Sequence, residues 1–159
     1  MNTFRRRTYR SPRDAVADLW RIFSSRKKIR ALMREDRIPP AFRERIMLTV
    51  TAVNRCRYCS YAHSREALAR GIPQKEIESL AEGMFAGSPA REVPALLYAQ
   101  HWAERDGRPE QDVREKVVAA YGSEEVELME MAMRLIRAGN LLGNTFDYFL
   151  HRISFGRLG

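Results

Sequence analysis

The only two cysteines of the chain stand close to a histidine, in the order Cys56, Cys59 and His63. Their spacing is Cys-x2-Cys-x3-His, and Glu44 stands twelve residues before Cys56 in an apolar, helix-patterned segment. Positions three or four residues apart share one face of a helix, so Cys59 and His63 would point the same way. These residue types at this spacing predict a thiol-based redox site.

A cysteine that reduces a peroxide must be a thiolate, and three features of this segment favour the anion. With Asn54 as the predicted N-cap, Cys56 falls in the first turn of a helix, where unpaired N–H groups stabilise negative charge. Arginines on both sides of Cys56 add positive charge. The His63 imidazole can accept the proton of Cys59, and Glu44 would hold the other ring nitrogen and fix its tautomer.

The same spacing suits the second half of a redox cycle. Cysteines at i and i+3 of a helix start have Cα atoms about 5–6 Å apart, which a disulfide accepts. Cys56 would therefore capture a sulfenic acid on Cys59, and an external dithiol would regenerate the pair.

A zinc site made of both cysteines, His63 and Glu44 is an alternative, since Cys-x2-Cys is a common zinc half-site. Two packed thiols beside a surface histidine are another.

Helical periodicity runs through the chain, and no useful stretch alternates with period two. We therefore expect an all-α single domain of about six or seven helices. Around the motif, one helix is expected over residues 41–53 and the next from Asn54 to about Arg70. Near the end of the chain, Gly139 and Gly143 either let another helix approach closely or break the helix at Gly139-Asn140.

Helix starts are also predicted outside the motif. Ser11-Pro12 opens a first helix whose apolar pattern extends past Ser24-Ser25, and Ser88-Pro89 repeats the same start signal. Ser123, followed by acidic residues, is expected to cap the last long helix.

Length and charge limit the class of protein. The chain has 159 residues, 45% of them hydrophobic and 30% charged, which fits one globular domain without a membrane span. The net charge is +8, and the whole basic excess lies in residues 1–34, which hold eleven basic and two acidic side chains. This excess would suit nucleic acid or an acidic partner, but a solvated helix face with a frayed arm is the favoured interpretation. With no recognisable export signal and few cysteines, a cytoplasmic location is expected.

The motif resembles the alkyl hydroperoxidase D (AhpD)-like branch of the carboxymuconolactone decarboxylase superfamily. The signature of that branch is Glu-x11-Cys-x2-Cys-x3-His, which Glu44, Cys56, Cys59 and His63 match at every position. The resemblance implies an all-α fold of helical hairpins, homotrimers or homohexamers, and hydroperoxide reduction without cofactor or metal. It also implies a dithiol or lipoyl-type protein as reductant, a peroxidatic role for Cys59 and a resolving role for Cys56.

The resemblance extends from about residue 28 to 153. It divides the chain into residues 1–27, a basic N-terminal arm with the start of the first helix, and residues 28–159, the AhpD-like domain. One position departs from the pattern: well-studied members carry a second histidine where this chain has Tyr58. A phenol is a hydrogen-bond donor at neutral pH rather than a base, so the proton relay would be shorter or slower.

We therefore expect a thiol-dependent hydroperoxide reductase. In this interpretation Cys59 attacks the peroxide, His63 takes the thiol proton, Glu44 orients His63 and Cys56 resolves the sulfenic acid. A non-catalytic redox sensor or interaction module is the alternative from another class. A lactone decarboxylase is less favoured, because that branch does not depend on a cysteine pair.

Overall fold

The computed structural model describes residues 4–34 and 37–155, and within these ranges it contains eight helices and no strand. The expected all-α class is confirmed, with slightly more helices than the six or seven predicted, and no helix in these ranges is long and apolar enough to cross a membrane. The helices are α1 (Pro12–Ser24), α2 (Arg26–Leu32), α3 (Pro40–Asn54), α4 (Arg57–Ala69), α5 (Gln74–Ala81), α6 (Val93–Glu104), α7 (Gln111–Tyr121) and α8 (Ser123–Ile153).

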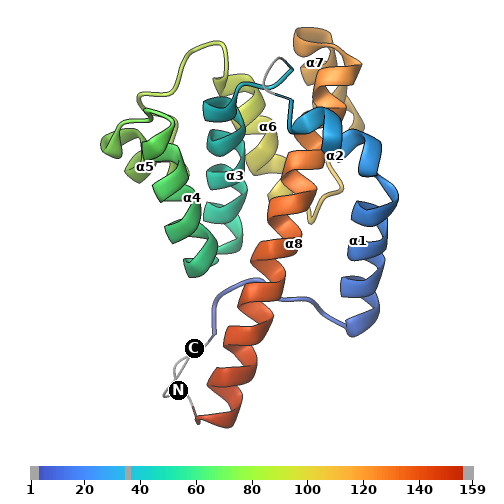
Figure 1. Ribbon diagram of the computed structural model, residues 1–159, viewed down its shortest axis with the longest axis vertical. Helices are drawn as coiled ribbons and strands as arrows, with labels where there is room; N and C mark the ends of the chain where they lie inside the picture. Colours follow the sequence, from blue (N-terminus) through green and yellow to red (C-terminus); the bar gives the residue numbers. More distant parts are fainter. Residues whose placement is uncertain (1–3, 35–36, 156–159) are drawn as a thin grey trace.

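Helices α3 and α8 form the centre of the molecule. Helix α8 has 31 residues, runs the length of the structure, and separates α1 from α3, α4 and α5 (Figure 1). Helix α3 contacts α4, α5, α6 and α8, so ten of its 15 residues are buried. Its apolar residues Ile46 and Val50 are fully inaccessible and pack into a core shared with Trp102 and Met133. A helix enclosed in this way also carries its polar side chains, including Glu44, into the interior.

The connection between α3 and α4 differs from the sequence prediction. Asn54 is the last residue of α3 rather than the N-cap of α4. Arg55 takes the left-handed conformation with φ 59°, and Cys56 is the N-cap of α4. The buried Asn54 side chain instead donates to the Oδ1 atom of Asn140 at 3.1 Å. A tertiary contact thus overrides the capping preference of asparagine.

Two other predicted helix boundaries were wrong. The first helical pattern breaks at Ser25, where the hydroxyls of Ser24 and Ser25 both donate to the Arg21 carbonyl and compete with helical bonding. Helix α6 begins at Val93 rather than at Pro89, because the intervening residues form a turn.

The last helix also differs from its predicted form. Helix α8 continues unbroken through Gly139 and Asn140. Ser123 is its first residue, and Gly122 takes the N-cap position in place of the predicted serine.

Residues 4–11 form a strap across α8 rather than a frayed arm (Figure 1). The Arg7 N–H donates to the Asn54 carbonyl at 3.4 Å, and Asn144 donates to the Arg7 carbonyl at 2.9 Å. Further along, the Tyr9 N–H donates to the Thr145 hydroxyl at 3.1 Å. The strap therefore joins the end of α3 to the second half of α8, next to the start of α4.

Candidate functional site

The structure brings Glu44 and His63 together. Glu44 lies on α3 and His63 on α4, and the Oε2 atom of Glu44 is 2.7 Å from the Nδ1 atom of His63. The Glu44 side chain is 6% exposed and the His63 side chain is 26% exposed. The carboxylate therefore fixes one ring nitrogen from the protein interior, while part of the ring is open to solvent.

The two cysteines lie at the start of α4. Cys56, as N-cap, accepts a hydrogen bond from the Cys59 N–H at 3.4 Å. The two Sγ atoms are 2.9 Å apart, which is within hydrogen-bonding distance. Both residues are free cysteines; Cys56 is 0% exposed and Cys59 is partly exposed. The pair is thus reduced, in contact, and open to solvent through Cys59 alone.

The electrostatics of the pair are asymmetric. The hydrogen bond from the Cys59 thiol lowers the pKa of Cys56 to about 6, helped by backbone N–H groups and opposed by burial. Donating that hydrogen bond raises the pKa of Cys59, burial raises it further, and the Asn140 amide offsets only part of the rise. In the reduced protein the negative charge therefore lies on Cys56, whereas the sequence analysis expected a thiolate on Cys59.

A buried amide network supports the cysteines from α8. Asn140 is 0% exposed, and its Nδ2 atom donates to the Thr51 hydroxyl at 3.2 Å. Its Oδ1 atom accepts from Asn54, so one side chain links two positions of α3 to the neighbourhood of Cys59. This role of Asn140 was not predicted from the sequence. An asparagine inside an apolar helix pattern does, however, indicate a buried polar contact.

A second polar cluster surrounds Asp147, which the sequence analysis did not single out. Asp147 is 0% exposed and accepts hydrogen bonds from Tyr58 at 2.7 Å and from Arg57 at 2.9 Å. Arg6, from the strap, pairs with the same carboxylate. The Tyr58 hydroxyl, at the position of the expected second histidine, is therefore bound to α8 and is not part of a relay to the cysteines.

The structure contains neither a continuous proton relay from Cys59 to His63 nor a complete set of zinc ligands among the residues it describes. In the part of the chain that the structure describes, no hydrogen bond joins the His63 ring to either sulfur. Within the same ranges, no three His, Cys, Asp or Glu side chains come together as a metal-ligand set. The geometry therefore gives the zinc alternative no support, and a proton must cross a gap to reach His63.

The described chain is an all-α protein with a reduced cysteine pair and a carboxylate–imidazole pair on two adjacent helices. The family model described as the carboxymuconolactone decarboxylase family matches residues 22–105, more than half of the chain, and the chain belongs to that family. The matched region includes Glu44, Cys56, Cys59 and His63. Comparison with curated proteins and with solved structures gives no match.

Proposed function

We propose that this family member is a thiol-dependent hydroperoxide reductase of the AhpD-like branch. The observation that carries the proposal is the 2.9 Å contact between Cys56 and Cys59, in which one thiol has a lowered pKa. A disulfide bond is about 2.05 Å long, so a small movement of either side chain would join the sulfurs. A cysteine pair with a purely structural role has no need of an ionised member.

The first proposed step is attack by Cys59. Its sulfur is partly exposed, whereas Cys56 is inaccessible. Moving the shared proton from Cys59 to Cys56 places the thiolate on the exposed sulfur. That thiolate attacks the terminal oxygen of the hydroperoxide, the O–O bond breaks, and the departing alkoxide takes a proton from solvent to become an alcohol. The sulfur becomes a sulfenic acid, and the peroxide gains two electrons.

The second step closes the disulfide. Cys56 passes its proton to His63, which Glu44 holds by the Nδ1 atom. The Cys56 thiolate then attacks the sulfenic sulfur of Cys59, and the hydroxide that leaves takes the proton from His63 to form water. A dithiol protein or lipoyl group returns two electrons and two protons by thiol–disulfide exchange. The cycle converts one hydroperoxide and one dithiol into an alcohol, water and a disulfide.

The test is consumption of tert-butyl hydroperoxide by the full chain with dihydrolipoamide as reductant. We expect multiple turnovers in the wild type, none in Cys59→Ser, and at most one oxidation without an internal disulfide in Cys56→Ser. Ser60→Ala, on the same helix, is the control and should retain the wild-type rate. Mass spectrometry of each oxidised protein identifies the sulfenic acid and the disulfide.

Two results would contradict the proposal. A single oxidation per protein that does not repeat with reductant would identify a redox sensor. Wild-type activity in a Cys56→Ser, Cys59→Ser double variant would show that the chemistry does not use thiols, as for a decarboxylase.

A further inference from the structure

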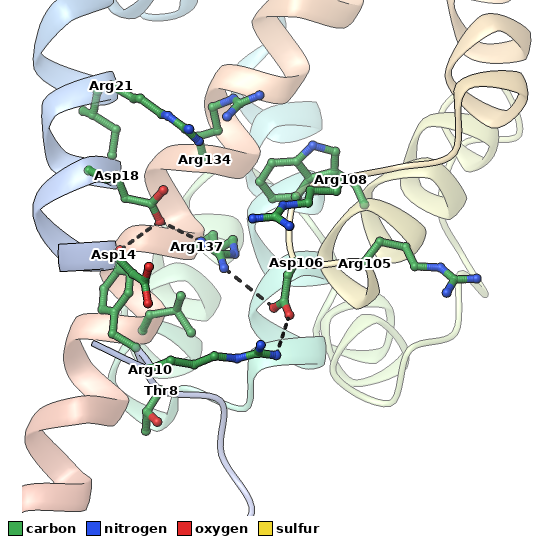
Figure 2. A pocket seen from close by; sticks show the side chains of 16 residues that line it. Thr8, Arg10, Asp14, Asp18, Arg21, Arg105, Asp106, Arg108, Arg134 and Arg137 are labelled. Atoms are coloured by element: carbon green, nitrogen blue, oxygen red, sulfur yellow. Dashed lines mark hydrogen bonds and ion pairs between the residues drawn. The ribbon is translucent and has the colours of Figure 1, made fainter. Parts of the chain in front are cut away.

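A cavity of about 430 Å³ lies among the strap, α1, α8 and the loop between α6 and α7 (Figure 2). Its walls include strap residues Thr8 and Tyr9, Trp102 of α6, and Leu141 of α8. None of the four residues predicted for the redox site lines it. Its volume is within the usual range for small-molecule sites, and the proposed peroxide chemistry does not use it.

Charged side chains dominate the lining of this cavity. Six arginines and three aspartates contribute, so the cavity has an excess of three positive charges. The basic residues come from the strap, from α1, from the loop after α6 and from α8; they are Arg10, Arg21, Arg105, Arg108, Arg134 and Arg137. Because four separate segments supply them, the fold itself gathers the positive charge.

The aspartates compensate only one part of the cavity. Arg137 pairs with Asp18 at 2.7 Å and lies 3.6 Å from Asp106 (Figure 2). Asp106 is shared further with Arg7 at 3.4 Å and Arg10 at 3.6 Å. Even so, the buried Nε atom of Arg137 has no hydrogen-bond partner. Asp18 and Asp106 are therefore engaged with arginines, Asp14 accepts a hydrogen bond from the Ser11 hydroxyl at 3.0 Å, and one buried donor is left over.

Three other guanidinium groups have no such compensation. Within residues 4–34 and 37–155, no carboxylate lies within 4.0 Å of the guanidinium group of Arg21, Arg108 or Arg134. Arg134 instead lies over the Trp102 ring, 5.9 Å from its centroid. Arg21 and Arg134 also line a second, smaller cavity of about 240 Å³. Cations held together without anions repel one another, and a bound anion would relieve that repulsion.

We propose that this cavity is a binding site for a small, multiply charged oxyanion of the diphosphate or polycarboxylate kind. The guanidinium groups of Arg21, Arg108 and Arg134, which have no carboxylate partner, would bind the anion. Arg137 would donate its unpaired Nε–H. The planar guanidinium fork matches the oxygen geometry of both phosphate and carboxylate. A cavity with arginines converging from separate segments fits a compact ligand better than the extended backbone of a nucleic acid, which requires an open basic surface.

The test uses titration calorimetry and thermal unfolding of the full chain, with sodium pyrophosphate and citrate as separate probes at constant ionic strength. We expect one-site, saturable binding of at least one probe, and the tighter of the two identifies the ligand class. At a probe concentration of 100 times Kd, the unfolding midpoint should rise by about 5–10 °C. Sodium chloride at matched ionic strength should give no saturable shift.

Three variants locate the site. Arg134→Gln and Arg108→Gln should each weaken binding about tenfold or more, because each removes a charge-assisted contact. Arg108 lies in the loop after α6, so its variant tests the site even if Arg134→Gln perturbs α8. Arg13→Gln removes the same charge from α1 outside the cavity and should leave Kd within about twofold of the wild type.

Three outcomes would overturn the proposal. One is that neither probe shows saturable binding at concentrations up to about 10 mM, which is well above the Kd of a useful site. Another is equal weakening by Arg13→Gln and by the cavity variants, which would indicate a general charge effect. The third is binding of a short DNA duplex but of neither probe, which would make the basic residues a nucleic-acid surface.

Discussion

Cys56 owes its lowered pKa first to the hydrogen bond from the Cys59 thiol and then to the backbone N–H groups at the N-terminus of α4. We predict that the 240 nm absorbance of the reduced protein rises with a midpoint near pH 6, by the amount for one thiolate. Cys56→Ser should abolish this rise, and Cys59→Ala should move the midpoint upward because the thiol donor is lost. Oxidised protein is the control and should show no rise. A wild-type midpoint at the ordinary value for a cysteine would contradict the hydrogen-bonded pair.

The same pKa predicts how stability depends on pH. Between pH 6 and the ordinary cysteine value of 9.0, unfolding the reduced protein requires proton uptake at Cys56. This contribution therefore increases as pH rises through that interval and is lost as pH falls through the folded pKa. Urea unfolding gives the free energy of unfolding of the wild type and of Cys56→Ser at pH 6 and at pH 8.5. The contribution of Cys56 is the amount by which this free energy rises more in the wild type than in the variant.

Glu44 is proposed to act through His63, so it is a positioning residue. Glu44→Gln keeps an oxygen that can accept from the Nδ1–H but removes the negative charge. We predict that peroxide turnover falls about tenfold or more, while the thiolate titration of Cys56 is unchanged. Glu66→Gln, an exposed change on α4, is the control and should keep the wild-type rate. Equal rates for both variants would remove Glu44 from the relay.

Sequence alone could predict the Cys56–Cys59 and Glu44–His63 pairs, but not the gap between the two pairs or how charge is shared between the cysteines. The spacing of Glu44 and His63 follows from helix geometry and the packing of two consecutive helices. The thiolate at Cys56 depends on Arg55 taking a left-handed conformation, which is usually a glycine position. Asp147 and Asn140 lie far along the chain, and only the packing of α8 brings them to the start of α4.

At the scale of the helices, the two glycines in the middle of α8 have different surroundings. A Cβ atom at Gly143 would lie 3.2 Å from the Sγ atom of Cys56, whereas one at Gly139 would meet nothing within 4 Å. We predict that Gly139→Ala stabilises the protein by about 0.5–1 kcal/mol, since alanine is the better helix former. Gly143→Ala should lose this gain, because Cys56 must shift to make room.

Gly143→Ala should also disturb the redox pair, because displacing Cys56 lengthens its contact with Cys59. Urea unfolding and the thiolate titration measure the two effects on the same protein. Equal stabilisation by both alanines with an unchanged titration would show that Cys56 is not held against α8.

The helices themselves were largely predictable, and the errors have local causes. Apolar periodicity together with start and stop signals predicts the existence and order of the long helices. The break at Ser25 and the late start of α6 depend on side-chain and turn hydrogen bonds that compete with helix formation. The strap of residues 4–11 has no periodic pattern, and its position is set by partners on α3 and α8.

At the scale of the whole molecule, a buried ion-pair cluster joins three parts of the fold. Arg45 of α3 contacts Glu76 of α5 at 2.6 Å and Glu92, before α6, at 3.2 Å, and all three side chains are at most 10% exposed. Replacing Arg45 by Met leaves the buried Glu76 carboxylate without its cation and leaves the buried Glu92 carboxylate with Arg91, 4.0 Å away. We predict a loss of about 3–5 kcal/mol in the free energy of unfolding, measured with urea at pH 7.

The loss should be smaller at pH 5. Burial already raises the pKa of Glu92, and removing the cation raises it further, so the folded variant takes up a proton more readily than the unfolded chain. Lys75→Met, at an exposed position of α5, is the control and should change stability by less than about 0.5 kcal/mol. A loss in Arg45→Met that does not depend on pH would contradict this explanation.

The homotrimer or homohexamer implied by the family resemblance stays a prediction at this scale. Four large apolar residues, each more than 40% exposed, follow one face of the second half of α8: Leu142, Phe146, Phe149 and Ile153. Burying this stripe against another copy would remove it from water. We predict that Phe146→Glu with Phe149→Glu lowers the mass measured by sedimentation, while Leu97→Glu on α6 leaves it unchanged. A monomeric wild type would contradict the prediction.

The complete burial of Cys56 decides where an incoming reductant can bond to the oxidised protein. An incoming thiol can reach only the Cys59 sulfur of the disulfide, so the mixed disulfide should always form on Cys59. The Cys56 sulfur then leaves as a thiolate, which the N-terminus of α4 stabilises. Glutathione, which has a single thiol and cannot complete the exchange alone, should leave a mass tag on the peptide that contains Cys59.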